Sequence, residues 1–169
     1  MAEGPALKRL SPTAVGAAIA RAERYRLLNE PEEAESICLD VLEVEPHSQP
    51  ALRILLLARS DQIPHGGSRA LSLAREVLPR LESEYERAYF HGVVCERHAK
   101  ALLKRKGRRS GGIAFEWFQS ALEAYEQAEA LAEPGNDEAV LRWNACLRTI
   151  ERHPHCARDP EEQEHFGLE

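Results

Sequence analysis

The sequence predicts an all-α protein built from successive helices. Apolar residues recur at steps of three and four along most of the chain, which is the spacing of one face of an α-helix. Glycine and proline, 10 of each, concentrate between these periodic runs, and β-branched runs with strict alternation are missing. The chain has 169 residues, of which 43% are hydrophobic and 30% charged, so it fits one thin helical domain.

The N-terminal part of the chain predicts a tail followed by two helices. Residues 1–10 combine mixed charge with glycine and proline, and we expect a flexible tail there. Ser11-Pro12 is typical of an N-cap and the first position of a helix, and this helix should run to about Asn29. Pro31 opens the next helix, which should end near Glu45.

The second of these helices carries the most informative pattern in the chain. A small residue, a bulky one, another small one and a closing proline are expected in order, and Ala34, Cys38, Val41 and Pro46 hold those positions. This order resembles the second helix of a tetratricopeptide (TPR) repeat. The resemblance implies a domain over residues 11–152, in which about three antiparallel helical hairpins form a right-handed superhelical array, a TPR-like solenoid.

The first hairpin then covers about 11–46, and the second covers about 48–82. Leu52, Leu55 and Leu56 fall at positions that the repeat reserves for packing between helices. We expect a loop at 63–67, longer than the usual tight turn, before the return helix of the second hairpin.

A third hairpin covers about 83–133. Ser83 and Glu86 form a capping box, so its first helix begins there and continues to about Arg105. Gly92 fits the position that the repeat keeps small. The partner helix carries an apolar seam at three- and four-residue steps, namely Ala114, Trp117, Phe118, Ala121, Tyr125 and Ala128.

A capping helix over 136–152 should close the array, because the last apolar face of a repeat stack needs a cover. Asn136 is its expected N-cap, and Trp143 is expected to cover the aromatic seam. Residues 153–169 form an acidic tail that we expect to be disordered, apart from anchoring by Phe166 and Leu168.

The resemblance also implies a function, because the first helices of stacked hairpins line a concave groove that holds a segment of another protein. The residues that the repeat register places in this groove are Glu23, Arg26, Arg53, Leu57, Glu86, Tyr89, Arg97 and Arg148. Guanidinium groups bind carboxylates through paired hydrogen bonds, so an acidic segment or a free C-terminus is the expected ligand class. We therefore expect a non-enzymatic adaptor or scaffold; ordinary solvated side chains are the alternative interpretation of these residues.

Members of the superfamily that bind chaperone C-termini use lysine and asparagine in the inward positions of the first repeats. This chain has Glu23, Arg26, Arg53 and Leu57 there, which argues against a chaperone co-factor role.

A basic loop at 104–109 is the alternative binding site, for nucleic acid or an anionic lipid surface. Its charged residues are Lys104, Arg105, Lys106, Arg108 and Arg109. No aromatic residues interleave with these charges to stack bases, and the net charge of the chain is −6, so the sequence argues against nucleic acid as the main partner. The helix dipole offers a simpler explanation of these charges, because it stabilises cations near the C-terminal end of a helix without any ligand.

Two small clusters combine histidine with cysteine: His91, Cys95 and His98, and His153, His155 and Cys156. Zinc prefers such ligands, but the first cluster falls in a helix that must pack on two neighbours, where cysteine acts as a small apolar residue. We therefore predict no metal and no cofactor. Gly66-Gly67 and Gly111-Gly112 lack the pattern of a phosphate-binding loop, and no nucleophile is set beside a base, so we predict no enzymatic activity.

No apolar run is long enough to span a bilayer, and the N-terminus lacks the pattern of a secretory signal, so we expect a cytoplasmic protein without membrane insertion. The 4 cysteines are scattered and are expected to be reduced. The sequence leaves the identity of the partner, the pathway and the oligomeric state open.

Overall fold

A computed structural model describes residues 4–105, 107 and 109–157, and this part of the chain is all-α. It contains seven α-helices and two short 3-10 turns, and no strand. The predicted fold class is confirmed at this level. The helices are α1 (Val15–Leu27), α2 (Pro31–Val44), α3 (Gln49–Asp61), α4 (Ile63–Arg75), α5 (Glu84–Leu103), α6 (Ser110–Leu131) and α7 (Glu138–Arg152), with 3-10 turns η1 (Pro12–Ala14) and η2 (Leu78–Arg80).

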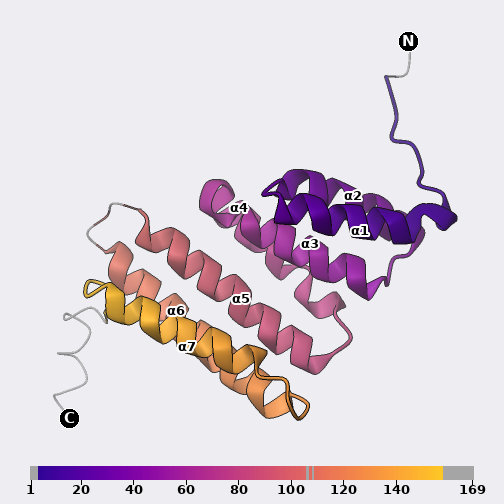
Figure 1. The fold of residues 1–169 in the computed structure, drawn as a ribbon. Helices are drawn as coiled ribbons and strands as arrows, with labels where there is room; N and C mark the ends of the chain where they lie inside the picture. Colours follow the sequence, from indigo (N-terminus) through magenta and orange to yellow (C-terminus); the bar gives the residue numbers. More distant parts are fainter. Residues whose placement is uncertain (1–3, 106, 108, 158–169) are drawn as a thin grey trace.

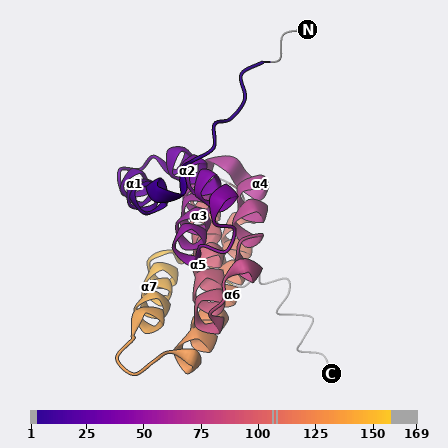
Figure 2. The same cartoon turned by 90° about the vertical axis from the view of Figure 1, so that its right-hand side faces the viewer.

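The helices form a row in which each helix packs against the next one along the chain. Figure 1 shows α1 and α2 at one end of this row and α6 and α7 at the other, with α5 between α3 and α6. In addition, α1 contacts α3, and α3 contacts α5. Figure 2 shows α1 and α7 on one side of the molecule and α4 and α6 on the other, with α3 and α5 between them.

Several predicted helix ends are confirmed, and each has a local cause. Pro31 occupies the first turn of α2, where its missing N–H costs no hydrogen bond. The hydroxyl of Ser83 accepts a hydrogen bond of 3.2 Å from the backbone N–H of Glu86, so the predicted N-cap of α5 is in place. The predicted N-cap at Asn136 is wrong, because Asp137 occupies the N-cap position of α7, which begins at Glu138. The side chain of Asn136 still accepts a hydrogen bond of 3.3 Å from the N–H of Glu138.

The loop predicted at 63–67 is wrong. Ile63 to Gly66 form a helical turn, Ile63 is buried, and the break comes at Gly67 alone, which has φ 57° and ψ −138°. This backbone conformation is open to glycine and strained for other residues. The apolar Ile63 therefore starts the return helix early, and one glycine provides the bend that the longer loop was expected to supply.

The core confirms most packing positions expected from the repeat pattern. Ala34, Cys38 and Val41 of α2 are buried. Leu56 of α3 is buried as well, although the repeat favours a small residue there. The seam along α6 is buried at Ala114, Phe118, Ala121, Tyr125 and Ala128, while Trp117 is half-buried. Trp143 of α7 is also half-buried and packs against this core.

A close contact between α5 and α6 depends on Gly92. A Cβ atom at this position would lie 2.5 Å from Cε1 of Tyr125, so only glycine leaves room for the tyrosine ring. Tyr125 is among the largest fully buried side chains. Gly92 thus sets the distance between the two longest helices.

Part of the tail predicted at 153–169 is folded, namely residues 153–157. Residues 153–157 fold back onto the first turn of α6, where a Cβ on Gly111 would overlap the carbonyl oxygen of His155. Cys156 is buried at 3% exposure because of this turn. Residues 158–169, with the expected anchors Phe166 and Leu168, lie outside the described residues, as do residues 1–3 of the N-terminal tail. Within the described chain, no helix is long and apolar enough to cross a bilayer.

Replacing Gly92 with alanine is expected to lower the free energy of unfolding by about 1–3 kcal/mol, because the added methyl group overlaps the ring of Tyr125. The loss should occur although alanine favours an α-helix over glycine by about 1 kcal/mol. Urea unfolding followed by circular dichroism measures the change. Gly16→Ala in α1 is the matched control: its Cβ meets nothing within 4 Å, and we expect a gain of about 0.5–1 kcal/mol. A Gly92→Ala variant as stable as the wild type would contradict the close contact.

Candidate binding face

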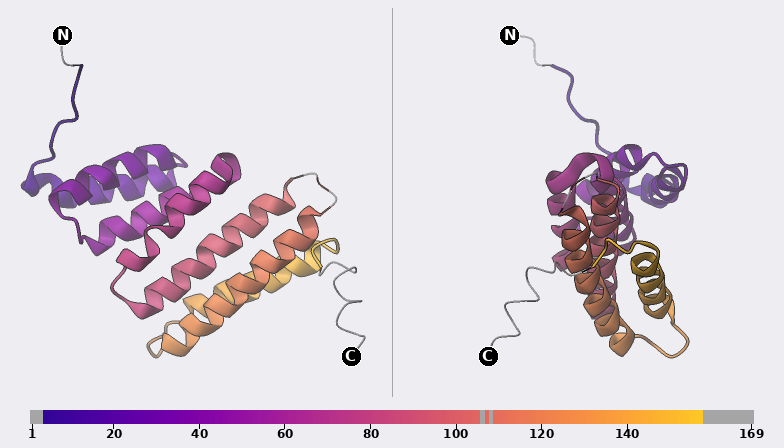
Figure 3. Two further views of the ribbon diagram at one scale, coloured as in Figure 1. Left: turned by 180° about the vertical axis from the view of Figure 1, so that it is seen from behind. Right: turned by 90° about the vertical axis from the view of Figure 1, so that its left-hand side faces the viewer.

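All eight residues predicted for the groove lie on the odd-numbered helices. Glu23 and Arg26 belong to α1, Arg53 and Leu57 to α3, and Arg148 to α7, while Glu86, Tyr89 and Arg97 belong to α5. The right-hand view of Figure 3 shows the indigo α1 and the yellow α7 on the same side of the molecule. We call the side formed by α1, α3, α5 and α7 the candidate face.

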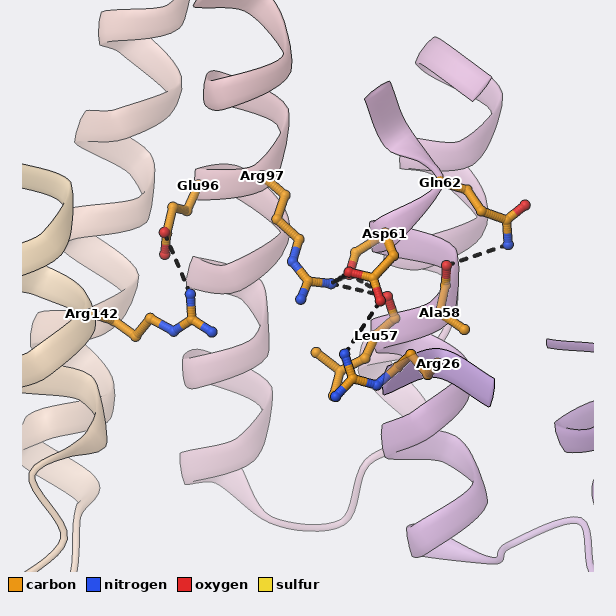
Figure 4. A network of polar contacts seen from close by, with 9 residues as sticks. Arg26, Leu57, Ala58, Asp61, Gln62, Glu96, Arg97 and Arg142 are labelled. Atoms are coloured by element: carbon orange, nitrogen blue, oxygen red, sulfur yellow. Dashed lines mark hydrogen bonds and ion pairs between the residues drawn. The ribbon is translucent and has the colours of Figure 1, made fainter. Parts of the chain in front are cut away.

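Three of the predicted residues meet at the end of α3. Nη1 of Arg97 lies 2.7 Å from Oδ1 of Asp61, and Nη1 of Arg26 lies 3.3 Å from Oδ2 of the same carboxylate. Nη1 of Arg97 also donates to the backbone carbonyl of Leu57 at 3.0 Å and to the hydroxyl of Ser60. Figure 4 shows the two arginines approaching Asp61 from α1 and α5. One carboxylate therefore joins three helices.

The guanidinium of Arg97 is held away from bulk water, with a side chain that is 20% exposed. Burial lowers the pKa of Arg97; the charge of Asp61 opposes this effect, and the nearby Arg142 and Arg26 add to it. Nε of Arg26 is buried and has no hydrogen-bond partner among the described residues. Buried charges need a partner of opposite charge, and for Arg26 and Arg97 this partner is Asp61. The two arginines therefore hold the helices together, whether or not they also bind a ligand.

A second pair joins α3 and α5 near the other end of the candidate face. Nη1 of Arg53 donates to Oε1 of Glu86 at 2.7 Å, and both side chains are partly exposed. Glu86 lies in the first turn of α5, where the helix dipole favours an acidic side chain. The predicted ligand-binding arginine Arg53 thus already has a carboxylate partner within the chain.

The strongest polar cluster was missed by the sequence analysis. Glu96 of α5 is buried at 1% exposure and accepts a hydrogen bond of 2.6 Å from the hydroxyl of Tyr125. Its other oxygen pairs with Lys100 and lies 3.5 Å from Nη1 of Arg142 in α7. Figure 4 shows Arg142 reaching Glu96 across the gap between the two helices. Glu96 therefore joins α5, α6 and α7.

The pKa values of this cluster follow from its burial and its charges. Burial alone would raise the pKa of Glu96, but hydrogen bonds from Lys100 and Tyr125 and the charges of Lys100 and Arg142 outweigh it, and the pKa is lowered. Burial and the charge of Glu96 raise the pKa of Tyr125, which stays a phenol and donates. Burial opposes the charge on Arg142, yet Glu96 and a hydrogen bond with Tyr89 raise its pKa.

One signal in the sequence points to Glu96. It lies three residues from both Val93 and Ala99, on an apolar stripe of a helix that packs on both sides. A second signal is Arg142 on α7, because this charged residue interrupts the apolar run of the capping helix. A buried acid and a half-buried base on helices expected to touch are the pattern of a structural ion pair.

The remaining predicted residues differ in exposure. Glu23 and Arg148 are exposed and form no ion pair with any described residue. Tyr89 is half-buried in an aromatic group, with its ring centroid 5.8 Å from that of Tyr85 and 5.9 Å from that of Tyr125. The structure thus brings the central residues of the prediction together and leaves the two outer charges open to solvent.

The ion-paired residues of α1, α3, α5 and α7 include more cations than carboxylates. The cations are Arg26, Arg53, Arg59, Arg87, Arg97, Lys100 and Arg142, and the carboxylates are Asp61, Glu84, Glu86 and Glu96. Glu23 and Arg148 cancel each other. In a chain with a net charge of −6, this face is a local exception.

A scan against protein-family models and searches of curated proteins and of solved structures return no match.

The first histidine and cysteine cluster is part of the packing. Burial raises the pKa of Cys95 to about 11 and lowers the pKa of His91 and His98. The ring of His98 meets the ring of Trp117 edge-on, with centroids 4.6 Å apart. Over the described residues, no group of three or more histidine, cysteine, aspartate or glutamate side chains is arranged to hold a metal ion.

The second cluster shapes the turn after α7. Nδ1 of His153 lies 2.8 Å from the backbone carbonyl of Thr149, and the rings of His153 and His155 meet edge-on at 5.7 Å. Cys156 of the same turn is buried, and burial raises its pKa. The histidine contacts shape this turn, and the backbone of His155 lies against Gly111 of α6.

The basic loop is only partly described. Lys104, Arg105 and Arg109 are exposed at the ends of α5 and α6. Lys106 and Arg108 lie outside the described residues.

Replacing Glu96 with glutamine is expected to lower the free energy of unfolding by about 1–3 kcal/mol, because Lys100 and Arg142 lose their charged partner in a buried site. The lowered pKa of Glu96 means that its stabilising contribution is present above the ordinary pKa of glutamate and is lost as the pH falls through the folded-state value. Urea unfolding at a series of pH values should therefore show a smaller loss of stability on acidification for Glu96→Gln than for the wild type.

The matched control is Glu123→Gln on α6, where the glutamate is exposed. We expect a change within about 0.5 kcal/mol and an unaltered pH profile for this variant. Equal behaviour of the two variants would contradict the role assigned to Glu96.

Proposed function

We propose that this protein is a non-enzymatic adaptor that holds a segment of another protein on the candidate face. The proposal includes the finer architecture expected from the sequence: about three antiparallel hairpins in a right-handed TPR-like array, closed by α7 as a capping helix. Its support is the gathering of the predicted residues on α1, α3, α5 and α7.

The contacts between helices support this architecture. In a stack of hairpins, each helix contacts its neighbours in sequence, and the first helices of adjacent hairpins also meet. The contacts of α1 with α3 and of α3 with α5 follow this pattern. The first helices then form one continuous surface, which is the surface that repeat proteins use for extended ligands.

The positive excess on the candidate face is the observation that carries the proposal. Charge on a surface selects partners of opposite sign and speeds their encounter. An acidic segment of another protein therefore fits this face better than a basic one. The arginines are already fixed by their ties to Asp61 and Glu86, so binding orders few side chains and loses little entropy.

Arg97 is placed to serve both the fold and a ligand. The hydrogen bonds that it forms with described residues all come from Nη1. A guanidinium has five N–H donors, so one nitrogen can hold the helices while another faces an incoming carboxylate.

The thiols support a role without nucleophilic catalysis. All 4 cysteines are buried. Burial raises the pKa of Cys38 and Cys146 to about 12, so these groups stay protonated and unreactive at neutral pH.

The test exchanges the charges of one ion pair on the candidate face. In the double variant Arg53→Glu and Glu86→Arg, the pair remains but the charge presented to a ligand changes position. Affinity purification with crosslinking from lysate should recover about tenfold less partner with this variant than with the wild type. Circular dichroism should show the same helix content for both, because the pair between α3 and α5 is retained.

Two controls separate the candidate face from other surfaces. Arg69→Glu should leave capture unchanged, because Arg69 is an exposed residue of α4, a helix that Figure 2 shows on the opposite side of the molecule from α1 and α7. Lys104→Gln with Arg105→Gln should also leave capture unchanged. If this variant instead abolishes capture, or retention on heparin or anionic vesicles, the basic loop is the functional site and the proposal is wrong. Capture that is insensitive to the exchanged pair would also contradict it.

A further inference from the structure

The two ends of the row of helices expose different kinds of surface. At the C-terminal end, the exposed residues of α7 are Leu141 and the charged Glu138, Arg148, Glu151 and Arg152. At the N-terminal end, α1 and α2 pack on each other and on α3, and no described helix lies on their far side. We call that far side the N-terminal end face.

The N-terminal end face is apolar at its centre. One shallow depression between η1, α1 and α2 is lined by Leu10, Ala14, Ala17, Ala18 and Ile37, together with the charged Arg21 and Asp40. An adjoining depression beside α2 is lined by Leu7, Leu10 and Leu39 together with charged residues. Leu39 is 43% exposed and Leu7 is 97% exposed. A contiguous apolar surface of this kind is typical of an interface rather than of scattered surface residues.

Charges of both signs surround this apolar centre. Lys8 and Arg9 lie on the extended N-terminal segment, and Asp40 and Glu43 lie on α2 across the second depression. None of the four forms an ion pair with any residue in the described part of the chain. The same face therefore presents a basic strip and an acidic strip that are both available.

The N-terminal segment is placed to reach beyond its own chain. Residues 4–9 form no helix, and Figure 1 shows the segment running away from α1 and α2. Leu10 packs against the core of its own chain, whereas Leu7 makes almost no contact that shields it from water. The segment thus carries an unburied leucine and two unpaired cations next to an acidic, apolar helix face.

We propose that the N-terminal end face is a two-fold interface with a second copy of this chain. A two-fold interface requires a patch that is complementary to itself. If one residue of the first copy contacts a different residue of the second copy, the same contact is repeated with the two copies exchanged. Here Leu7 of each copy packs against Leu39 of the other, and Lys8 and Arg9 face Asp40 and Glu43 across the axis. A partner of one charge sign would leave either the basic or the acidic strip unpaired. A second copy presents both strips and can pair with both, so it fits this face best. This interface is separate from the candidate face and does not depend on the proposed adaptor function.

The test is the mass of the full-length protein in solution, measured by sedimentation equilibrium over the micromolar range. The wild type should be a dimer, and Leu39→Glu should weaken the dimer by at least about tenfold. The variant loses a leucine that the interface would bury and adds a carboxylate beside Asp40 and Glu43. Leu39 is already partly exposed, so circular dichroism should show an unchanged helix content. Leu141→Glu, at the exposed leucine of α7, is the matched control and should remain a dimer.

A charge exchange identifies the second copy as the occupant. Asp40→Lys alone should weaken the dimer, and combining it with Arg9→Glu should restore it, because both changes meet across the two-fold axis. A wild type that is monomeric throughout the concentration range overturns the proposal, even if another protein then binds in a manner that depends on Leu39. Open-ended growth into larger species that depends on Leu141 also overturns it, since that would mean head-to-tail stacking of α7 on α1 and α2.

Discussion

The arrangement of the helices depends on two carboxylates that lie between them. Asp61 at the end of α3 holds an arginine from α1 and an arginine from α5, and Glu96 holds side chains from α6 and α7. Ion pairs of this kind contribute little net stability, because each charge loses its hydration on burial. These ion pairs fix the relative positions of the helices. Apolar contacts allow one helix to slide along another, whereas a hydrogen-bonded carboxylate holds its neighbours at one position along the helix axis.

This arrangement changes how the arginines of the candidate face should be understood. From the repeat pattern, they were expected to point toward a ligand. The structure gives Arg26, Arg53 and Arg97 carboxylate partners inside the chain, so part of their function is to join helices. Both functions are compatible, since a guanidinium that is already held in place offers its remaining donors at little cost in entropy.

Much of the fold could be predicted from the sequence, because its signals are local. Ala34, Cys38 and Val41 are buried where the repeat pattern placed them, and the cap at Ser83 depends on a residue only three positions away. The errors came from features that local patterns do not encode. Ile63 is buried and already helical before the break at Gly67, and the pairing of Glu96 with Arg142 joins residues far apart in the chain. Helical periodicity predicts which side of a helix a residue of the candidate face occupies, but the internal partners of these residues depend on how the helices stack.

The burial of every cysteine has a practical consequence for experiments on this chain. The 4 native thiols are shielded in the core, and for Cys38, Cys95 and Cys146 burial raises the pKa to between about 11 and about 12. Thiol-reactive dyes attack the thiolate and need access to it, so the native residues react slowly while the protein is folded. A cysteine introduced on the surface therefore becomes the preferred attachment point for a fluorophore or spin label, without prior removal of the native ones.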